Sequence, residues 1–167
     1  MIFIGIDPGI AGAVAIMLNE ATISITDCPA TTVEMSTILY PFRGATNVRV
    51  ALEEVPKVIN RRATPSEQKR GIKFVMVPAT ELRMNYGEWR GILTAHRIPF
   101  ETVPPKKWQS ILDGAKKKGT KFRAFDMAQR LYPNAELKGP RGGVKYGRSD
   151  ALTMAEWLKR QYKAIDL

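Results

Sequence analysis

The N-terminal stretch, residues 1–16, constrains the fold of this chain more than any other segment. Residues 2–6 are mostly apolar and rich in β-branched side chains, a pattern that predicts a buried strand. This strand ends at a carboxylate, Asp7, after which a Pro-Gly pair predicts a turn and a second apolar run follows. A carboxylate that closes an apolar central strand is costly to bury unless a cation meets it. We therefore expect Asp7 to be a metal ligand, with capping of its own turn as the alternative.

Hydrophobic patterns further along the chain predict alternating strands and helices. Strands are expected at residues 2–6, 13–18, 22–26, 47–53 and 98–103, with the first three in a meander. Helices are expected at residues 35–40, 80–96, 105–112, 120–132 and 149–163. A chain of 167 residues, 44% of them hydrophobic, fits one α/β domain over residues 1–167. It has no run of about 18 apolar residues, so we expect no membrane-spanning helix.

Positive charge is concentrated in particular segments. The net charge is +10, and 17 of the 26 lysines and arginines fall in residues 57–73, 106–123 and 138–148. Such clustering predicts a basic surface stripe that binds a polyanion, for which a merely solvated face is the alternative. Because Pro65 and Gly71 interrupt it, we expect residues 57–73 to form a mobile loop without continuous regular structure. The candidate nucleic-acid-binding residues are Lys57, Arg61, Arg62, Lys69, Arg70, Lys106, Lys107, Lys116, Lys117, Lys118 and Arg148.

The cysteine content and the N-terminus indicate the compartment. Cys28 is the only cysteine, so the chain can form neither an internal disulfide nor a cysteine-based zinc site. The apolar N-terminus lacks a basic region and is interrupted by Asp7, unlike a signal peptide. We expect a soluble intracellular protein, in the cytoplasm, an organelle or a phage-infected host cell, rather than a secreted one.

Two further carboxylates occupy positions comparable to that of Asp7. Glu53 ends the predicted strand 47–53, and Asp150 lies in the first turn of the last predicted helix. If the first and fourth strands are adjacent and parallel, their carboxyl ends meet, and three carboxylates gathered there repel unless divalent cations neutralise them. Oxygen ligands fit Mg²⁺ or Mn²⁺, and two such ions would activate a water for phosphodiester hydrolysis. The alternatives are a solvated strand end for Glu53 and a favourable helix dipole for Asp150.

Several short motifs resemble those of the RuvC family, Holliday-junction resolvases of the RNase H-like superfamily. The stretches that carry the resemblance are Ile4-Gly5-Ile6-Asp7-Pro8-Gly9 followed by Gly12-Ala13, Ala51-Leu52-Glu53, and Gly147-Arg148-Ser149-Asp150-Ala151-Leu152. Three stretches are similar to the phage and chloroplast branches of the family. They are the motif at residues 147–152, Tyr86-Gly87-x-Trp89 and Pro105-x-x-Trp108-Gln109. Together these stretches extend over nearly the whole chain.

The resemblance implies a fold, a reaction and a set of site residues. It implies a five-stranded mixed sheet, three antiparallel strands followed by two parallel ones, flanked by helices. It implies a homodimer that nicks two strands of a four-way DNA junction symmetrically with Mg²⁺, for which Mn²⁺ substitutes. By motif position, Asp7, Glu53 and Asp150 are carried over as the catalytic metal ligands. Lys121 is carried over as the catalytic lysine near the scissile phosphate, and Lys118 competes for that role.

This chain departs from the family pattern at two places. Family members usually have a further acid or a histidine three or four residues before the last aspartate, where this chain has Gly147 and Tyr146. Glu54 or water would then complete the site. Bacterial members also carry an aromatic wedge after the catalytic glutamate, but residues 55–57 are Val-Pro-Lys, so the basic loop or another element must open the junction.

Other functions remain as alternatives to a junction resolvase. One is a related nuclease that acts on other branched or hybrid substrates, and another is a non-catalytic junction-binding protein. An actin-like nucleotide-binding domain shares the opening motif but is disfavoured, because the chain lacks a second Asp-x-Gly turn. For the dimer, we expect the interface on the helix at residues 80–96, through Met84, Tyr86 and Trp89 beside Gly87 and Gly91. The alternative is that these side chains pack only in the core.

Overall fold

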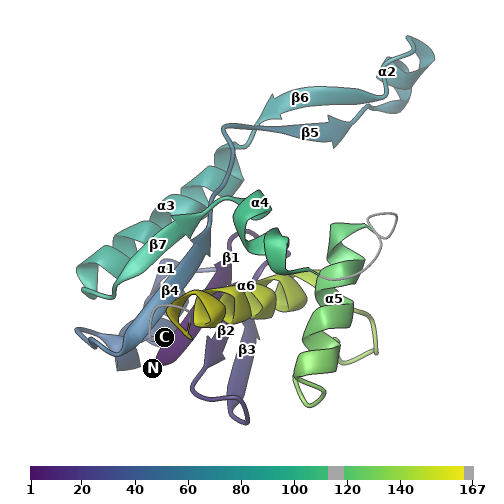
Figure 1. The fold of residues 1–167 in the computed structure, drawn as a ribbon. Coiled ribbons are helices and arrows are strands. Elements are labelled where there is room, and N and C mark those ends of the chain that lie inside the picture. The colour runs from purple at the N-terminus through teal and green to yellow at the C-terminus, as the bar shows by residue number, and fades with distance from the viewer. Residues whose placement is uncertain (113–118, 164–167) are drawn as a thin grey trace.

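The fold is built around a five-stranded mixed sheet with the strand order β3-β2-β1-β4-β7 (Figure 1). This computed structural model describes residues 1–112 and 119–163. The strands are β1 (Ile2–Asp7), β2 (Ala13–Met17), β3 (Ile23–Asp27), β4 (Val48–Glu53) and β7 (Phe100–Val103). The first three form an antiparallel meander, whereas β4 is parallel to β1 and β7 is parallel to β4. This topology confirms the mixed sheet expected from the sequence.

Helices cover both faces of the sheet and enclose two hydrophobic cores. The helices are α1 (Thr32–Leu39), α3 (Thr80–Ala95), α4 (Pro105–Trp108), α5 (Thr120–Leu131) and α6 (Tyr146–Lys163), of which α4 and α5 pack against α6. The short 3₁₀ turns are η1 (Tyr40–Phe42) and η2 (Gln109–Ile111). Side chains alternate along β1, so that Ile4 and Ile6 lie in the core with residues of α1 and α3, and Phe3 lies on the other face beside Tyr162 of α6. Among the described residues, no helix is long and apolar enough to cross a membrane.

Helix α3 buries two of the aromatic residues that we considered for a dimer interface. Tyr86 is 8% exposed and Trp89 is fully buried in the core with Leu93, so for these two side chains the core alternative is correct. Met84 is 64% exposed on the same helix. Around Gly87, the described residues leave the space that a Cβ atom would fill open.

Helix α6 lies directly against the backbone of β1. A Cβ atom at Gly5 would come within 2.0 Å of the Ala151 carbonyl oxygen, so only glycine permits this approach. The helix begins at Tyr146 rather than near Ser149, which places Asp150 in its second turn. The expectation that Asp150 lies in the first turn is therefore wrong, and the helix dipole there is a weaker reason for a carboxylate. The close contact with β1 instead brings Asp150 beside the end of the central strand.

Residues 57–78 form a projecting arm, not the irregular loop that we expected (Figure 1). The arm consists of β5 (Val58–Arg62), the short helix α2 (Pro65–Lys69) and β6 (Phe74–Pro78), with β5 and β6 paired antiparallel. Pro65 occupies the start of α2, where a missing N–H costs nothing, and Thr64 caps the helix in a capping box with Glu67. Gly71 supplies the left-handed turn before β6, with φ of +79°. Pro65 and Gly71 therefore mark the start of α2 and the turn before β6, and they do not prevent regular structure in the arm.

Candidate metal-binding active site

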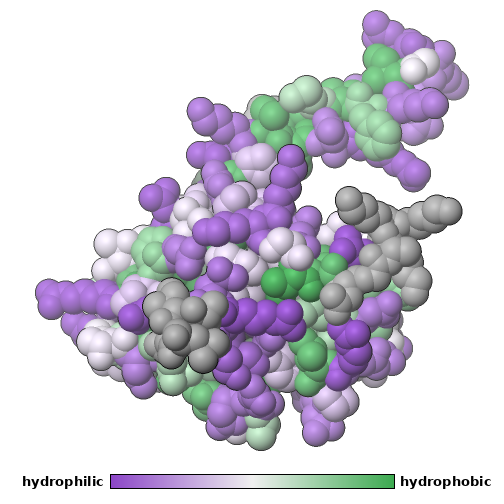
Figure 2. All heavy atoms as spheres, viewed as in Figure 1, coloured by the Kyte–Doolittle hydropathy of each residue, from purple (hydrophilic) through white to green (hydrophobic). Residues whose placement is uncertain are grey.

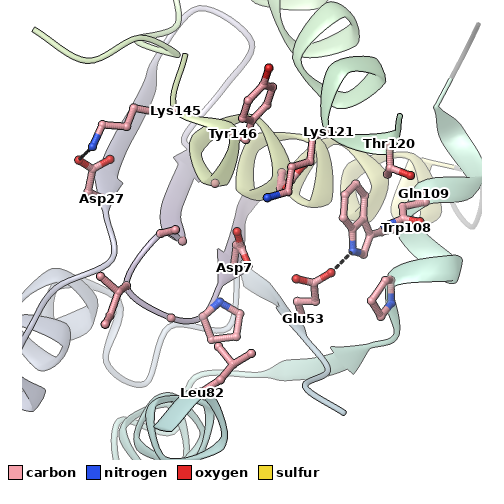
Figure 3. A pocket seen from close by; sticks show the side chains of 18 of the residues that line it. Asp7, Asp27, Glu53, Leu82, Trp108, Gln109, Thr120, Lys121, Lys145 and Tyr146 are labelled. Atoms are coloured by element: carbon pink, nitrogen blue, oxygen red, sulfur yellow. Dashed lines mark hydrogen bonds and ion pairs between the residues drawn. The ribbon is translucent and has the colours of Figure 1, made fainter. Parts of the chain in front are cut away.

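Four carboxylates line one cleft of about 730 Å³: the predicted Asp7, Glu53 and Asp150, and Asp27, which is paired with Lys145 and Arg148. Figure 3 labels Asp7, Asp27 and Glu53. Asp7 ends β1 and Glu53 ends the neighbouring parallel strand β4, so both side chains lie at the same edge of the sheet. Asp150 reaches the cleft from α6, and Lys121 enters it from the first turn of α5. All four candidate catalytic residues predicted from the sequence thus line the same cleft.

The pKa values of Asp7, Glu53 and Asp150 are all raised, so the protein alone disfavours their charged forms. Burial, then the charge and hydrogen bonding of Glu53, raise the pKa of Asp7 to about 9. Burial and the Glu53 charge raise the pKa of Asp150 to about 7, and burial also raises the pKa of Glu53. The Lys121 ammonium lowers the pKa of both aspartates but does not compensate for these effects. A bound cation would neutralise the charge that the protein leaves uncompensated.

Trp108 holds Glu53 in place, a contact that the sequence did not predict. The indole Nε1 donates a hydrogen bond of 3.0 Å to Glu53 Oε1, and Trp108 is only 1% exposed. The donor opposes the effect of burial on the pKa of Glu53. The two residues meet because β4 pairs with β7, whose end leads directly into α4. A tryptophan shortly after this strand was the only sequence signal of the contact.

Asn85 on α3 ties the turn that follows Asp7 to the helix layer. Its Oδ1 accepts a 2.8 Å hydrogen bond from the Gly9 N–H. Gly9 adopts φ of +104°, a conformation that favours glycine, and a Cβ atom there would lie 2.6 Å from Leu82 Cδ1. The same Asn85 oxygen lies 3.7 Å from Cys28 Sγ. Asn85, which belongs to none of the sequence motifs, thus anchors the turn that follows Asp7 to helix α3.

The donor set of the cleft fits a hard divalent cation. Asp150 Oδ1 is buried and has no hydrogen-bond partner among the described residues. A buried oxygen of this kind is available to coordinate a metal ion. Carboxylate oxygens are the ligands that Mg²⁺ and Mn²⁺ prefer. Within the described chain, however, no three His, Cys, Asp or Glu side chains already form a closed metal-binding cluster. Like charges repel, so carboxylates without a counter-ion are expected to stand further apart than ligands around one.

Close packing explains why residue 147 is glycine, at a position where RuvC-family members usually have a further acid or a histidine. A Cβ atom there would come within 2.1 Å of the Ala11 carbonyl oxygen and 2.8 Å of Gly12 Cα. Helix α6 therefore packs backbone against backbone on the turn after Asp7, and no side chain fits between them. Tyr146, one residue earlier, lines the cleft, while Glu54 is exposed.

The described residues among those predicted to bind nucleic acid belong to the arm, to α4 and to α6. Lys57, Arg62, Lys69 and Arg70 are exposed on the arm, and Lys106 and Lys107 are exposed on α4. Lys107 also forms a 3.5 Å ion pair with Glu101 and lies 5.2 Å from the centroid of the Trp157 ring. Lys116, Lys117 and Lys118 lie outside the described residues.

Two of the predicted basic residues make internal ion pairs. Arg61 holds Glu67 through two hydrogen bonds of 2.8 and 2.9 Å within the arm. The Arg148 side chain, only 14% exposed, binds Asp27 at 2.7 Å and donates to the carbonyl oxygens of residues 136 and 138. Both guanidinium groups therefore stabilise the fold locally.

The sheet, the helix layers and the acidic cleft at the ends of β1 and β4 define an RNase H-like fold. This fold matches solved structures of RuvC. Thermus thermophilus RuvC is similar with a TM-score of 0.58 and 16% sequence identity, over 97% of each chain. T. thermophilus RuvC in complex with a Holliday-junction substrate is similar with a TM-score of 0.53 and 15% identity, over 97% of this chain and 96% of that one. No protein-family model and no curated protein sequence matches the chain.

Proposed function

We propose that this protein is a metal-dependent endonuclease that resolves four-way DNA junctions by paired, symmetric nicks. The observation that carries the proposal is the meeting of Asp7, Glu53 and Asp150 in one cleft, where burial and mutual repulsion leave a deficit of positive charge. The RuvC-like fold supports it, as do the motifs that resemble those of the RuvC family. The chain's excess of basic residues supports a polyanionic substrate.

The side chains of the cleft have distinct roles in this proposal. Asp7, Glu53 and Asp150 would hold Mg²⁺ or Mn²⁺, which supplies charge neutralisation and an activated water for attack on a phosphodiester. Lys121, whose charge already acts on Asp7 and Asp150, stabilises negative charge on the reacting phosphate. Trp108 fixes the Glu53 carboxylate, and Asn85 fixes the turn that carries Asp7. Catalysis then depends on how these groups are positioned before substrate binds.

A cleavage assay on a panel of substrates tests the proposal. Four-way junctions, flaps, duplexes and RNA–DNA hybrids are incubated with and without Mg²⁺. We expect paired nicks in the four-way junction only with the metal, and we expect Asp7→Asn to abolish them while junction binding persists. Preferred cleavage of a flap or a hybrid would favour the related nuclease instead.

A non-catalytic junction-binding protein is the second candidate. The observation that favours it is Gly147, since close packing on the Asp7 turn excludes a fourth acidic ligand at this position. Tight junction binding without nicks at any Mg²⁺ or Mn²⁺ concentration would select this candidate.

We also propose that the protein acts as a homodimer. A four-way junction has approximate two-fold symmetry, and paired nicks in opposed strands need two active sites related in the same way. The exposed face of α3, with Met84, Gly87 and Gly91, is the proposed interface.

A further inference from the structure

The arm, residues 57–78, exposes an apolar face to solvent. Phe74 is 64%, Met76 69% and Val58 43% exposed. The pairings Asn60 with Met76 and Arg62 with Phe74 place all of these side chains on one face of the ribbon, because successive strand residues alternate between faces. Large apolar side chains gathered on an exposed surface indicate a binding site.

The opposite face of the arm is partly covered by the arm itself. Val75 and Val77 are half-buried there, Ile59 is 39% exposed, and Arg61 bridges from β5 to Glu67 on α2. At the tip, the Gln68 side chain donates a 2.7 Å hydrogen bond to the Ala63 carbonyl, and Ala63 is 4% exposed. The arm is thus folded by its own contacts, and its most exposed apolar side chains, Phe74 and Met76, lie on the other face.

The charges of the arm indicate which partner covers this face. Exposed cations surround it, and its sole acid, Glu67, is already held by Arg61. In Figure 2 the arm projects as hydrophobic patches interleaved with hydrophilic side chains. The exposed cations are Lys57, Arg62, Lys69, Arg70 and Lys73. A second copy would bring the same positive charge against this one, whereas a polyanion is attracted.

We infer that the arm binds double-helical DNA as a β-ribbon in the major groove, on a duplex next to the cleavage site. A two-stranded ribbon fits this groove, where apolar side chains such as those of Phe74 and Met76 contact thymine methyl groups. The cations then lie beside the flanking phosphates. Each strand has 5 residues, which span about 17 Å, the length of about five base pairs.

The position of the arm in the chain supports this role. Its first residue, Lys57, follows the predicted metal ligand Glu53 by a short connection, so DNA held by the arm continues toward the cleft. The inference rests on the proposed function in one respect, namely that branched DNA supplies the duplex. Binding alone tests it, independently of cleavage.

The test measures fluorescence anisotropy of a labelled four-way junction in EDTA, where metal-dependent cleavage cannot occur. The apolar variant combines Phe74→Ala and Met76→Ala, and its control combines Val33→Ala and Tyr40→Ala, which are 73% and 61% exposed in the wild type. We expect the apolar variant to bind about tenfold more weakly and the control to bind like wild type. Equal affinities of wild type and the apolar variant would overturn the inference, whereas no binding by wild type would overturn the proposed function.

Charge variants and shortened DNA provide independent readouts. The affinity falls as salt rises, and Arg62→Gln with Lys73→Gln should make the slope of log affinity against log salt less negative by about two. Arg43→Gln with Arg97→Gln should leave this slope unchanged. Shortening the junction's duplexes to about five base pairs or fewer should weaken wild type more than the apolar variant. A change of mass in light scattering for the apolar variant, with normal DNA binding, would assign this face to a second copy and overturn the inference.

Discussion

At the scale of single residues, Asp7, a proposed metal ligand, is expected to destabilise the metal-free protein. Its pKa is raised from the usual 3.8 to about 9, mainly by burial. Because the native state favours the protonated form, the unfolded chain loses this proton at lower pH than the folded protein does. The free energy of unfolding of the metal-free protein should therefore fall as pH rises from about 4 to about 9.

Replacing Asp7 by Asn removes this cost, so we expect Asp7→Asn to stabilise the metal-free protein at pH 8. The gap in melting temperature between variant and wild type should widen by several degrees from pH 5 to pH 8, at about 2–4 °C per kcal/mol. Circular dichroism in EDTA measures both melting temperatures. At pH 8, added Mg²⁺ should raise the melting temperature of wild type more than that of Asp7→Asn. A gap that does not change with pH would contradict the assigned pKa.

Trp108 makes a second prediction at this scale. Trp108→Phe keeps a buried aromatic ring but leaves Glu53 Oε1 without its donor. We expect cleavage to fall about tenfold or more, since a hydrogen bond to a charged group contributes about 1.5–3 kcal/mol. The lost donor should also raise the pKa of Glu53, which shifts the pH profile upward and raises the Mg²⁺ concentration needed for half-maximal activity.

Trp157→Phe is the matched control, because Trp157 is buried in the same core at 2% exposure. Trp157→Phe should lower the melting temperature without changing the pH profile or the Mg²⁺ dependence of cleavage. If Trp108 has only a structural role, Trp108→Phe should behave in the same way.

At the scale of elements, the contact between α6 and the turn after Asp7 decides how the site is completed. Gly147→Asp would place an acid where RuvC-family members usually have one, but its Cβ atom would lie 2.1 Å from the Ala11 carbonyl oxygen. We expect both Gly147→Asp and Gly147→Ala to lower the free energy of unfolding by about 1–3 kcal/mol through overpacking. Cleavage should be lost in both variants, because the turn that positions Asp7 must move.

Gly143→Ala serves as the control for this prediction, since the described residues leave the space around its Cβ position open. Urea unfolding gives the stability of all three variants. Increased cleavage by Gly147→Asp at unchanged stability would show instead that the site lacks only a ligand.

The sequence predicted the elements whose apolar runs are long and uninterrupted, and it failed where contacts are distant or short. The strands up to Asp7 and Glu53 alternate or run apolar, so their burial and ends were readable. The arm was missed because cations dominate residues 57–73 and because Pro65 and Gly71 resemble breakers. The Trp108–Glu53 contact spans 55 positions, and local periodicity carries no information on such a pair.

At the scale of the whole molecule, the proposed dimer requires a surface that would hold two copies of the cleft together. One face of α3 is buried in the core through Trp89 and Leu93, while the other exposes Met84, Gly87 and Gly91 to solvent. The two glycines would let a partner helix approach closely. This arrangement fits a closed two-fold dimer with one self-complementary interface, which matches the symmetry of a four-way junction.

The dimer makes the last prediction. Light scattering of the wild-type protein should give about twice 18.7 kDa, and Gly87→Arg should shift the mass toward one chain. The described residues leave the Gly87 Cβ position open, so the arginine is accommodated in a single chain, and a loss of mass reports the interface rather than misfolding. Gly143→Arg, at another open position, should keep the mass of wild type. If wild type is a monomer at micromolar concentration and still makes paired nicks, the two sites assemble only on DNA, and the α3 interface in the free protein is refuted.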